Sequence, residues 1–300
     1  MAIYQSPVML DEVAKLWGFS QIEILEEFNV SGNRAVLLIQ TDKGKLVVKG
    51  LPDSAPVMVP EGTSKALAFL ETKKIRLAPK LIRSLDGSTF LHVGSHYIYV
   101  MEFIEGRRME ANVGDEFLLG QAAATLHGIT DYGYPCTYDY YYEMNNMKQR
   151  FAGHEFKEEY DGILSSLPDF KRYRQCFIHT DIGPHNAVLS TGSEVVFIDL
   201  DDAGNGSPYV DLGWPFIMQF VDYNKQTGEM HYDFDITKAF LDGYRSIHEI
   251  SPDEMELVWA GGIFMHMSYM EVYGPDGVIP MWNILKFGMA QKEKVFQLLK

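Results

Sequence analysis

The sequence predicts an α+β protein with two lobes, a small β-rich N-terminal lobe and a larger, mainly helical C-terminal lobe. Short apolar runs bounded by turn residues fill the first third of the chain, and helical periodicity prevails after Gly106. The 300 residues, 46% of them hydrophobic, supply enough apolar material for about two cores of ordinary size. We place the lobe boundary after residue 104, which gives lobes of residues 1–104 and 105–300.

The pattern of apolar residues places the individual elements along the chain. Asp42-Lys43-Gly44 separates two apolar runs and predicts a hairpin turn. The expected elements are, in order, a helix over 6–17, strands over 21–28, 34–41 and 45–50, a helix over 62–73, strands over 80–85 and 97–103, and helices over 115–128 and 254–273.

Composition excludes several classes of protein. The net charge of −15, with no cluster of lysine and arginine, argues against a nucleic-acid partner. No apolar run approaches the roughly 18 residues of a membrane helix, and the first residues do not resemble a secretory signal. Cys136 and Cys176 are too few for a disulfide framework and lack metal-site spacing. We therefore expect no membrane association and a reducing, cytoplasmic compartment.

The most informative segment is a predicted hairpin with polar residues at its open end. Residues 187–190 and 194–198 are expected to be strands, with the turn between them. Asn186 precedes the first strand and Asp199 follows the second, so both lie at the open end, on strands about 4.8 Å apart. A Gly-Pro turn brings Asp181 to the same end. A carboxylate on a loop, with an Asn and an Asp suited to Mg²⁺, is the arrangement that kinases use for phosphoryl transfer.

Three motifs carry a family resemblance. His-x-Asp-x-x-x-x-Asn ends at Asn186, Ile-Asp-x-x-x-Ala contains Asp199, and Gly-x-Pro-x-x-Asp-Leu contains Asp211. Together they resemble the aminoglycoside phosphotransferase and choline kinase family, small-molecule kinases with a bilobal protein-kinase-like fold. The resemblance implies that Asp181 is the catalytic base and that Asn186 and Asp199 hold magnesium.

Three further residues of these motifs have expected roles. The resemblance implies that Asp211 fixes the catalytic loop and does not react. His179 is expected to hold the loop through hydrogen bonds. Thr180 is a departure, because the family most often has Gly there, and a β-branched residue restricts the backbone.

The N-terminal lobe is expected to bind ATP, with GTP as an alternative donor. Lys49 ends an apolar run like that of the kinase lysine strand and would contact the α- and β-phosphates, with Lys45 as its rival on the same strand face. The lysine should pair with a Glu on the next helix, either Glu61 or Glu71. Ser31, Gly32 and Asn33 are expected to form a loop that covers the phosphates, although a plain hairpin turn is the alternative. The hinge is expected to bind the adenine through backbone groups of Glu102 and Ile104.

The acceptor is expected to be a small, cationic molecule with a hydroxyl group. Tyr140 lies among aromatic and acidic residues that could bind an ammonium group, although a partly buried amphipathic segment would have the same pattern. Asp222 and Glu271 lie where the family builds its acceptor pocket. The candidates are aminoglycosides and metabolites such as choline, ethanolamine, homoserine or a sugar derivative.

Two other classes of protein compete with this prediction. A catalytically silent nucleotide-binding module would not need Asp181, Asn186 and Asp199 together. A protein kinase would carry the Asp-Phe-Gly and Ala-Pro-Glu signatures, which the sequence lacks.

Overall fold

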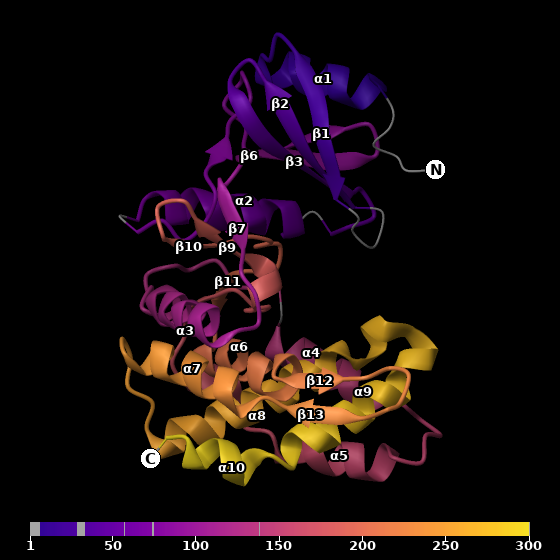
Figure 1. The fold of residues 1–300 in the computed structure, drawn as a ribbon. Coiled ribbons are helices and arrows are strands. Elements are labelled where there is room, and N and C mark those ends of the chain that lie inside the picture. Colours follow the sequence, from indigo (N-terminus) through magenta and orange to yellow (C-terminus); the bar gives the residue numbers. More distant parts are fainter. Residues whose placement is uncertain (1–6, 29–33, 57, 74, 138, 300) are drawn as a thin grey trace. The chain divides into compact units, whose positions relative to one another are not determined.

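The computed structural model describes residues 7–28, 34–56, 58–73, 75–137 and 139–299. These residues form two compact units (Figure 1). The first comprises Met1–Arg107 and Val188–Asp202, and the second comprises Arg108–Ala187 and Ala203–Lys300. The first unit ends near the boundary expected at residue 104, but it also includes a segment from much later in the chain.

The first unit is built on an antiparallel sheet in the order β1-β2-β3-β6-β4, with β5 paired to β6. The predicted turn between β2 and β3 is confirmed, since Thr41 pairs with Gly44, and Gly44 takes a φ of 106°. The elements are α1 (Pro7–Trp17), β1 (Ile22–Phe28), β2 (Ala35–Thr41), β3 (Gly44–Pro52), α2 (Met58–Glu71), β4 (Leu81–Ile82), β5 (Leu91–Val93) and β6 (His96–Glu102).

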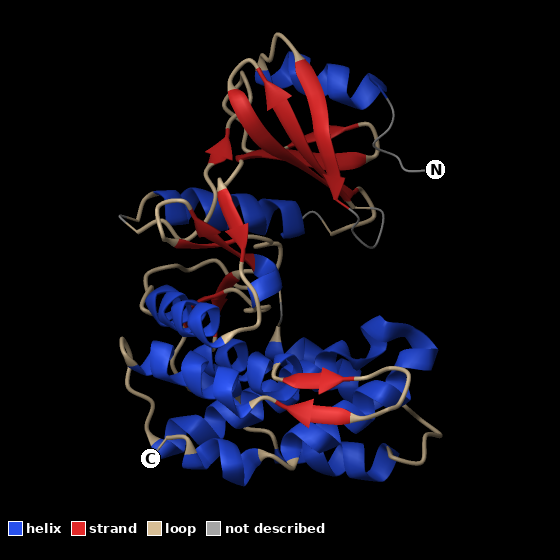
Figure 2. Cartoon of the chain, viewed as in Figure 1, coloured by secondary structure: helices blue, strands red, loops and turns tan. Residues whose placement is uncertain are grey.

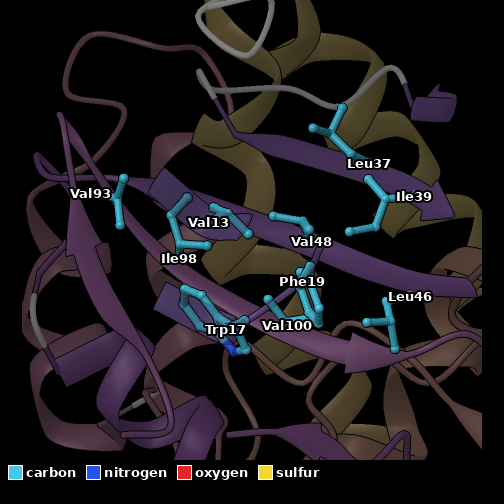
Figure 3. Close-up of a cluster of buried hydrophobic side chains, with 10 residues drawn as sticks. All are labelled: Val13, Trp17, Phe19, Leu37, Ile39, Leu46, Val48, Val93, Ile98 and Val100. Atoms are coloured by element: carbon cyan, nitrogen blue, oxygen red, sulfur yellow. The ribbon is translucent and has the colours of Figure 1, made fainter. Parts of the chain in front are cut away.

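One face of this sheet packs on α1 to form the core of the first unit (Figure 3). Val13 and Trp17, four residues apart on α1, lie on the same helix face and meet strand residues such as Val48 and Val100. The Trp17 indole N–H donates to the carbonyl of Ile82 at 2.7 Å, so its one polar atom is satisfied. Leu46 and Val48 of this core lie on β3, the strand that also carries Lys49.

A second sheet, ordered β10-β9-β7, consists of β7 (Gly106–Arg108), β9 (Ala187–Ser190) and β10 (Val195–Phe197). The hairpin predicted between residues 187 and 198 is therefore confirmed. Phe197 also donates its backbone N–H to the carbonyl of Leu77 at 2.9 Å. This bond ties the strand before Asp199 to the rest of the first unit.

The second unit is mainly helical, with only short strand pairs, β11 with β8 and β12 with β13 (Figure 2). Among the described residues, no helix combines the length and apolar character needed to cross a membrane. The elements are α3 (Val113–His127), α4 (Tyr140–Gln149), α5 (Lys157–Ser166), β8 (Cys176–Ile178), β11 (Gly204–Gly206), α6 (Pro208–Trp214), β12 (Val221–Tyr223), β13 (Met230–Tyr232), α7 (Phe234–Arg245), α8 (Pro252–Tyr269), α9 (Gly274–Met289) and α10 (Lys292–Gln297).

Glycine residues allow α3 and α7 to pack closely. A Cβ at Gly120 would lie 2.2 Å from the carbonyl oxygen of Phe240, and one at Gly243 would lie 2.0 Å from that of Phe117. Neither backbone could accept a side chain without moving apart. The close packing anchors α3, whose last residue, His127, lies 3.0 Å from Asp211 through its Nε2.

Glu116 on α3 is 1% exposed, and its Oε2 has no hydrogen-bond partner among the described residues. Burial, followed by the nearby charges of Asp115 and Asp233, raises the pKa of Glu116 to about 8. The carboxyl group is therefore protonated in the folded protein at neutral pH. In the unfolded chain the same group loses its proton above its ordinary pKa of 4.5. The free energy of unfolding therefore falls as the pH rises from 4.5, and the stabilisation by protonated Glu116 is lost by the time the pH passes 8.

Glu116→Gln should therefore raise the free energy of unfolding at pH 8 by about 2–3 kcal/mol. The amide has the shape of the protonated carboxyl group but does not ionise, so the side chain stays uncharged at both pH values. Urea unfolding at pH 5 and pH 8 would measure the effect, and the gain should shrink toward pH 5. Glu158→Gln, at an exposed position of α5, is the matched control and should change little at either pH.

Candidate active site

One buried carboxylate, that of Asp211, holds the loop that follows β8. Asp211, on α6 and fully buried, accepts hydrogen bonds from the backbone N–H groups of His179 and Thr180, both at 2.7 Å. Its Oδ2 also lies 3.0 Å from Nε2 of His127, whose Nδ1 lies 3.0 Å from the hydroxyl of Tyr244. Asp211 and His127 thus connect the loop to α6, α3 and α7.

Thr180 adopts a φ of 78°, in the left-handed region. A β-branched side chain is strained there, at a cost of about 1–2 kcal/mol, whereas glycine is not. This conformation accounts for the expectation of Gly at the position. The two backbone bonds to Asp211 hold the loop in this shape, so the strained residue stands directly before Asp181.

Asp181 is fixed by three neighbours in the second unit. Its Oδ1 accepts a bond from the indole N–H of Trp214 at 2.9 Å, and its Oδ2 accepts one from Nδ2 of Asn186 at 2.8 Å and lies 3.2 Å from Nε2 of His185. Burial alone would raise the pKa of Asp181. The hydrogen bond and charge of His185, together with His179 and Trp214, lower this pKa more, and the net shift is downward. Asp181 is therefore an ionised and oriented carboxylate at neutral pH.

Asn186 has an orientation that fits a cation. Its Nδ2 donates both to the carboxylate and to the backbone carbonyl of Asp181, at 2.8 and 3.0 Å. The opposite orientation of the amide would place its oxygen against these two acceptors, so the hydrogen bonds fix the assignment. Oδ1 is then the atom available to a hard cation such as Mg²⁺.

Lys49, the predicted phosphate-binding lysine, lies in the first unit. It is 6% exposed, and its Nζ pairs with Asp199 Oδ1 and, at 2.7 Å, with Asp201 Oδ2. Burial would lower the pKa of Lys49, but the charges of Asp201 and Asp199 raise it well above its ordinary value. Tyr99 donates to Asp201 Oδ1 at 2.5 Å and so fixes the second carboxylate. Lys49 is thus a permanently charged group beside Asp199.

The expected pairing of Lys49 with a helical glutamate is wrong. Glu61 instead pairs with Lys65 one turn along α2, at 2.7 Å, and both side chains are 45% exposed. Its helix begins at Met58, earlier than residue 62, and turns Thr63 and Ser64 inward. Glu71, the alternative, is exposed at the end of the same helix.

The other predicted nucleotide residues have varied environments. Glu102 is the last residue of β6, and its backbone N–H donates to the carbonyl of Lys80 at 3.0 Å. Its carboxylate pairs with Arg76 at 3.1 Å. Ile104 is buried. Lys45, the rival of Lys49, pairs with Glu105 at 3.0 Å and is 42% exposed. Ser31, Gly32 and Asn33 lie outside the described residues.

The three predicted acceptor residues have different environments. Tyr140 is buried on α4 and donates its hydroxyl to the carbonyl of Pro168 at 2.7 Å, which is a packing role. Asp222 is exposed on the β12–β13 hairpin. Glu271 pairs with Nε of Arg150 at 2.8 Å, so an internal cation already neutralises it.

Sequence reasoning missed several residues next to the predicted ones. Trp214 touches Asp181 directly and lies with its ring centroid 5.1 Å from that of Tyr269. Tyr273 lies close enough for the charge of Asp181, after burial, to raise its pKa. Asp201 could have been suspected from its position two residues after Asp199. Trp214 had a weaker signal, three residues after Asp211 in the third motif.

Comparison with known proteins shows the family. The profile of the phosphotransferase enzyme family matches residues 26–254. The chain belongs to this family. No curated protein sequence matches this phosphotransferase.

Solved structures with low sequence identity show the same fold as this phosphotransferase. An amicoumacin kinase in complex with AMP-PNP, Ca²⁺ and Ami has a TM-score of 0.69 and 18% identity, covering 96% of this chain and 94% of its own. A microcompartment-associated aminopropanol kinase has a TM-score of 0.69 and 14% identity, covering 98% and 100%. The choline kinase from Cryptosporidium parvum Iowa II has a TM-score of 0.63 and 13% identity, covering 93% and 91%.

These comparisons confirm the predicted family and the α+β, protein-kinase-like fold. The family match also confirms that the chain is an enzyme of the phosphotransferase class.

Proposed function

We propose that this phosphotransferase uses ATP and Mg²⁺ to transfer the γ-phosphoryl group to a hydroxyl of a small, amine-bearing molecule. The observation that carries the proposal is the carboxylate of Asp181, which Trp214 and Asn186 orient and which stays ionised at neutral pH. Such a group can accept the proton of an attacking hydroxyl. GTP remains the alternative donor.

The proposed roles follow the chemistry of each side chain. Asp181 orients the acceptor hydroxyl and takes its proton. Lys49, charged and held by two carboxylates, binds phosphate oxygens. Oδ1 of Asn186 and the carboxylate of Asp199 have the hard oxygen donors that Mg²⁺ prefers, and when bound the metal neutralises charge on the transferred phosphoryl group. Positioning and charge stabilisation then provide most of the catalysis.

The proposed acceptor class rests on charge and on one exposed aromatic side chain. The chain carries a net charge of −15, and the half-exposed Tyr273 lies close enough to Asp181 for the Asp181 charge, after burial, to raise its pKa. Aromatic faces and carboxylates favour a cation. Aminopropanol and choline, which name two of the structural relatives, each combine a nitrogen with a hydroxyl group. We extend this class to the present chain, in a cytoplasmic setting.

The test is ADP release with a panel of aminoglycosides, choline, ethanolamine, aminopropanol, homoserine and neutral sugars. An amine-bearing compound should be the best acceptor. Its KM should rise more than kcat changes between 0.1 and 1 M salt, because the Debye length falls from about 10 Å to about 3 Å. A best acceptor without positive charge would refute the acceptor class and leave the kinase assignment intact. The absence of acceptor-dependent ADP release across classes would count against the kinase.

The proposed metal ligands give a further prediction. Asp199→Ala and Asn186→Ala should each raise the Mg²⁺ concentration needed for half-maximal activity, by about tenfold or more for Asp199, which supplies a charge as well as an oxygen. A Mg²⁺ titration of ADP release would measure this. Asp202→Ala, in the same segment, is the comparison and should need Mg²⁺ as the wild type does. An unchanged requirement in Asp199→Ala would remove that residue from the site.

A further inference from the structure

The helix that carries Trp214 changes its form directly after this residue. α6 ends at Trp214, and Pro215–Gln219 continue it as a π-helix, η4. The backbone N–H of Phe220 donates to the carbonyl of Pro215, five residues back, at 3.0 Å. Pro215 has no N–H to donate to the preceding turn, so the α-helical hydrogen bonds are interrupted at the point where the wider turn begins.

The wider turn brings two side chains to the catalytic loop. Trp214 and Gln219 are five residues apart, which is about one turn of a π-helix but well over one turn of an α-helix. The indole N–H of Trp214 donates to Oδ1 of Asp181. Nε2 of Gln219 donates to the backbone carbonyl of Ile182, the next residue of the loop. One short helical segment therefore holds two consecutive loop residues.

The contact between Gln219 and the loop is close and buried. Ile182 is fully buried, so its backbone carbonyl needs a partner from within the protein. A Cβ at Gly183 would lie 2.5 Å from the amide of Gln219, so the absence of a side chain there makes room for the amide. Oε1 of Gln219 is buried without a hydrogen-bond partner among the described residues. Because this unpaired oxygen is costly, the bond to Ile182 shapes the loop more than it stabilises the fold.

We propose that Gln219 is a positioning residue for phosphoryl transfer, which acts on Asp181 through Ile182. The inference rests on the function proposed above for this phosphotransferase. Trp214 and Asn186 orient the carboxylate of Asp181, whereas Gln219 fixes the backbone of the residue that follows it. A small displacement of a catalytic group lowers turnover strongly, because the reacting atoms must meet in a defined geometry.

Gln219→Met removes the amide and keeps a side chain of similar length. The kcat with the best acceptor of the panel should fall by about tenfold or more, while KM for ATP and for the acceptor stays within about twofold. The melting temperature should stay within about 4 °C of the wild type, because removal of the unpartnered Oε1 offsets the lost hydrogen bond.

Gln291→Met is the matched control. Nε2 of Gln291 also donates to a backbone carbonyl, that of Phe287, at 3.1 Å, and Gln291 lies at the start of α10. This variant loses the same kind of bond, so it should leave kcat and both KM values unchanged. Gln219→Ala is a second variant of the tested residue and should reproduce the loss of kcat without depending on how a methionine packs.

A spectroscopic measurement follows the loop without any substrate. The indole N–H signal of Trp214, assigned by its loss in Trp214→Phe, reports the hydrogen bond to Asp181. In Gln219→Met this proton signal should move upfield, because the carboxylate shifts and the bond weakens. In Gln291→Met it should keep its position.

Four results would overturn the proposal. Wild-type turnover in Gln219→Met would show that the bond to Ile182 has no effect on catalysis, and a higher KM with unchanged kcat would assign Gln219 to substrate binding. A larger loss of melting temperature would make it a residue that supports the whole fold. An unmoved Trp214 signal would show that the loop does not depend on Gln219. A wild type without acceptor-dependent ADP release would instead refute the kinase function, and the Trp214 signal would still decide whether Gln219 holds the loop.

Discussion

Asp181→Asn is expected to lower turnover by about 10²-fold or more while ATP affinity stays within a few-fold. The amide keeps the size of the side chain but cannot accept a proton from the acceptor hydroxyl. Because Lys49 and its two carboxylate partners lie elsewhere in the chain, nucleotide binding should be spared. Steady-state ADP release and titration with a non-hydrolysable ATP analogue would separate the two effects.

A second variant tests whether the loss comes from chemistry or from geometry. Trp214→Phe removes the indole bond to Asp181 Oδ1 but leaves the base in place, so its loss of turnover should be smaller. Asp161→Asn, an exposed site on α5, is the neutral control. Near-normal phosphoryl transfer by Asp181→Asn to a verified acceptor would mean that another group is the base.

Asp211→Asn is expected to lower the free energy of unfolding by about 3 kcal/mol or more. The carboxylate receives two backbone N–H groups and lies beside His127, all in a fully buried site. An amide has one acceptor oxygen, and its NH₂ group would face one of these donors. The backbone N–H of either His179 or Thr180 would then lose its acceptor, and with it one of the two bonds that hold the strained loop.

Urea unfolding would measure the loss, and turnover of the remaining folded protein should also fall. Asp235→Asn, in the exposed first turn of α7, is the control and should change stability by less than about 0.5 kcal/mol. If Asp211→Asn is as stable as this control, the carboxylate does not support the loop.

The hairpin could be predicted from the sequence because the residues that determine it lie close together along the chain. Asn186 and Asp199 flank two short strands whose turn sets their register, and β9 and β10 form as expected. Asp181 and Asn186 are five residues apart, and their contact follows from one short loop. Motifs of this length can be interpreted without knowing the tertiary structure.

The partners that distant segments provide could not be predicted in this way. Lys49 and Asp199 are 150 residues apart, and Tyr99 meets Asp201 across 102. The error at Glu61 has a related cause, since the packing of α2 decides which of its side chains face inward: Thr63 and Ser64 are buried, and Glu61 pairs with Lys65 at the surface. Trp214 reaches Asp181 across 33 residues, through the path of the chain between β8 and α6. Such contacts depend on packing, which a pattern of residue types does not contain.

The discontinuous first unit has a consequence for biosynthesis. Residues up to Arg107 are synthesised long before Val188–Asp202, which complete the unit and contain both carboxylate partners of Lys49. Until then the lysine has neither carboxylate beside it, and burying its charge would be costly. We therefore expect the N-terminal segment to remain incompletely folded on the ribosome, although domains often fold in the order of their synthesis. A truncated chain ending at Arg107 should be readily digested by protease, whereas one that extends beyond Asp202 should protect β3.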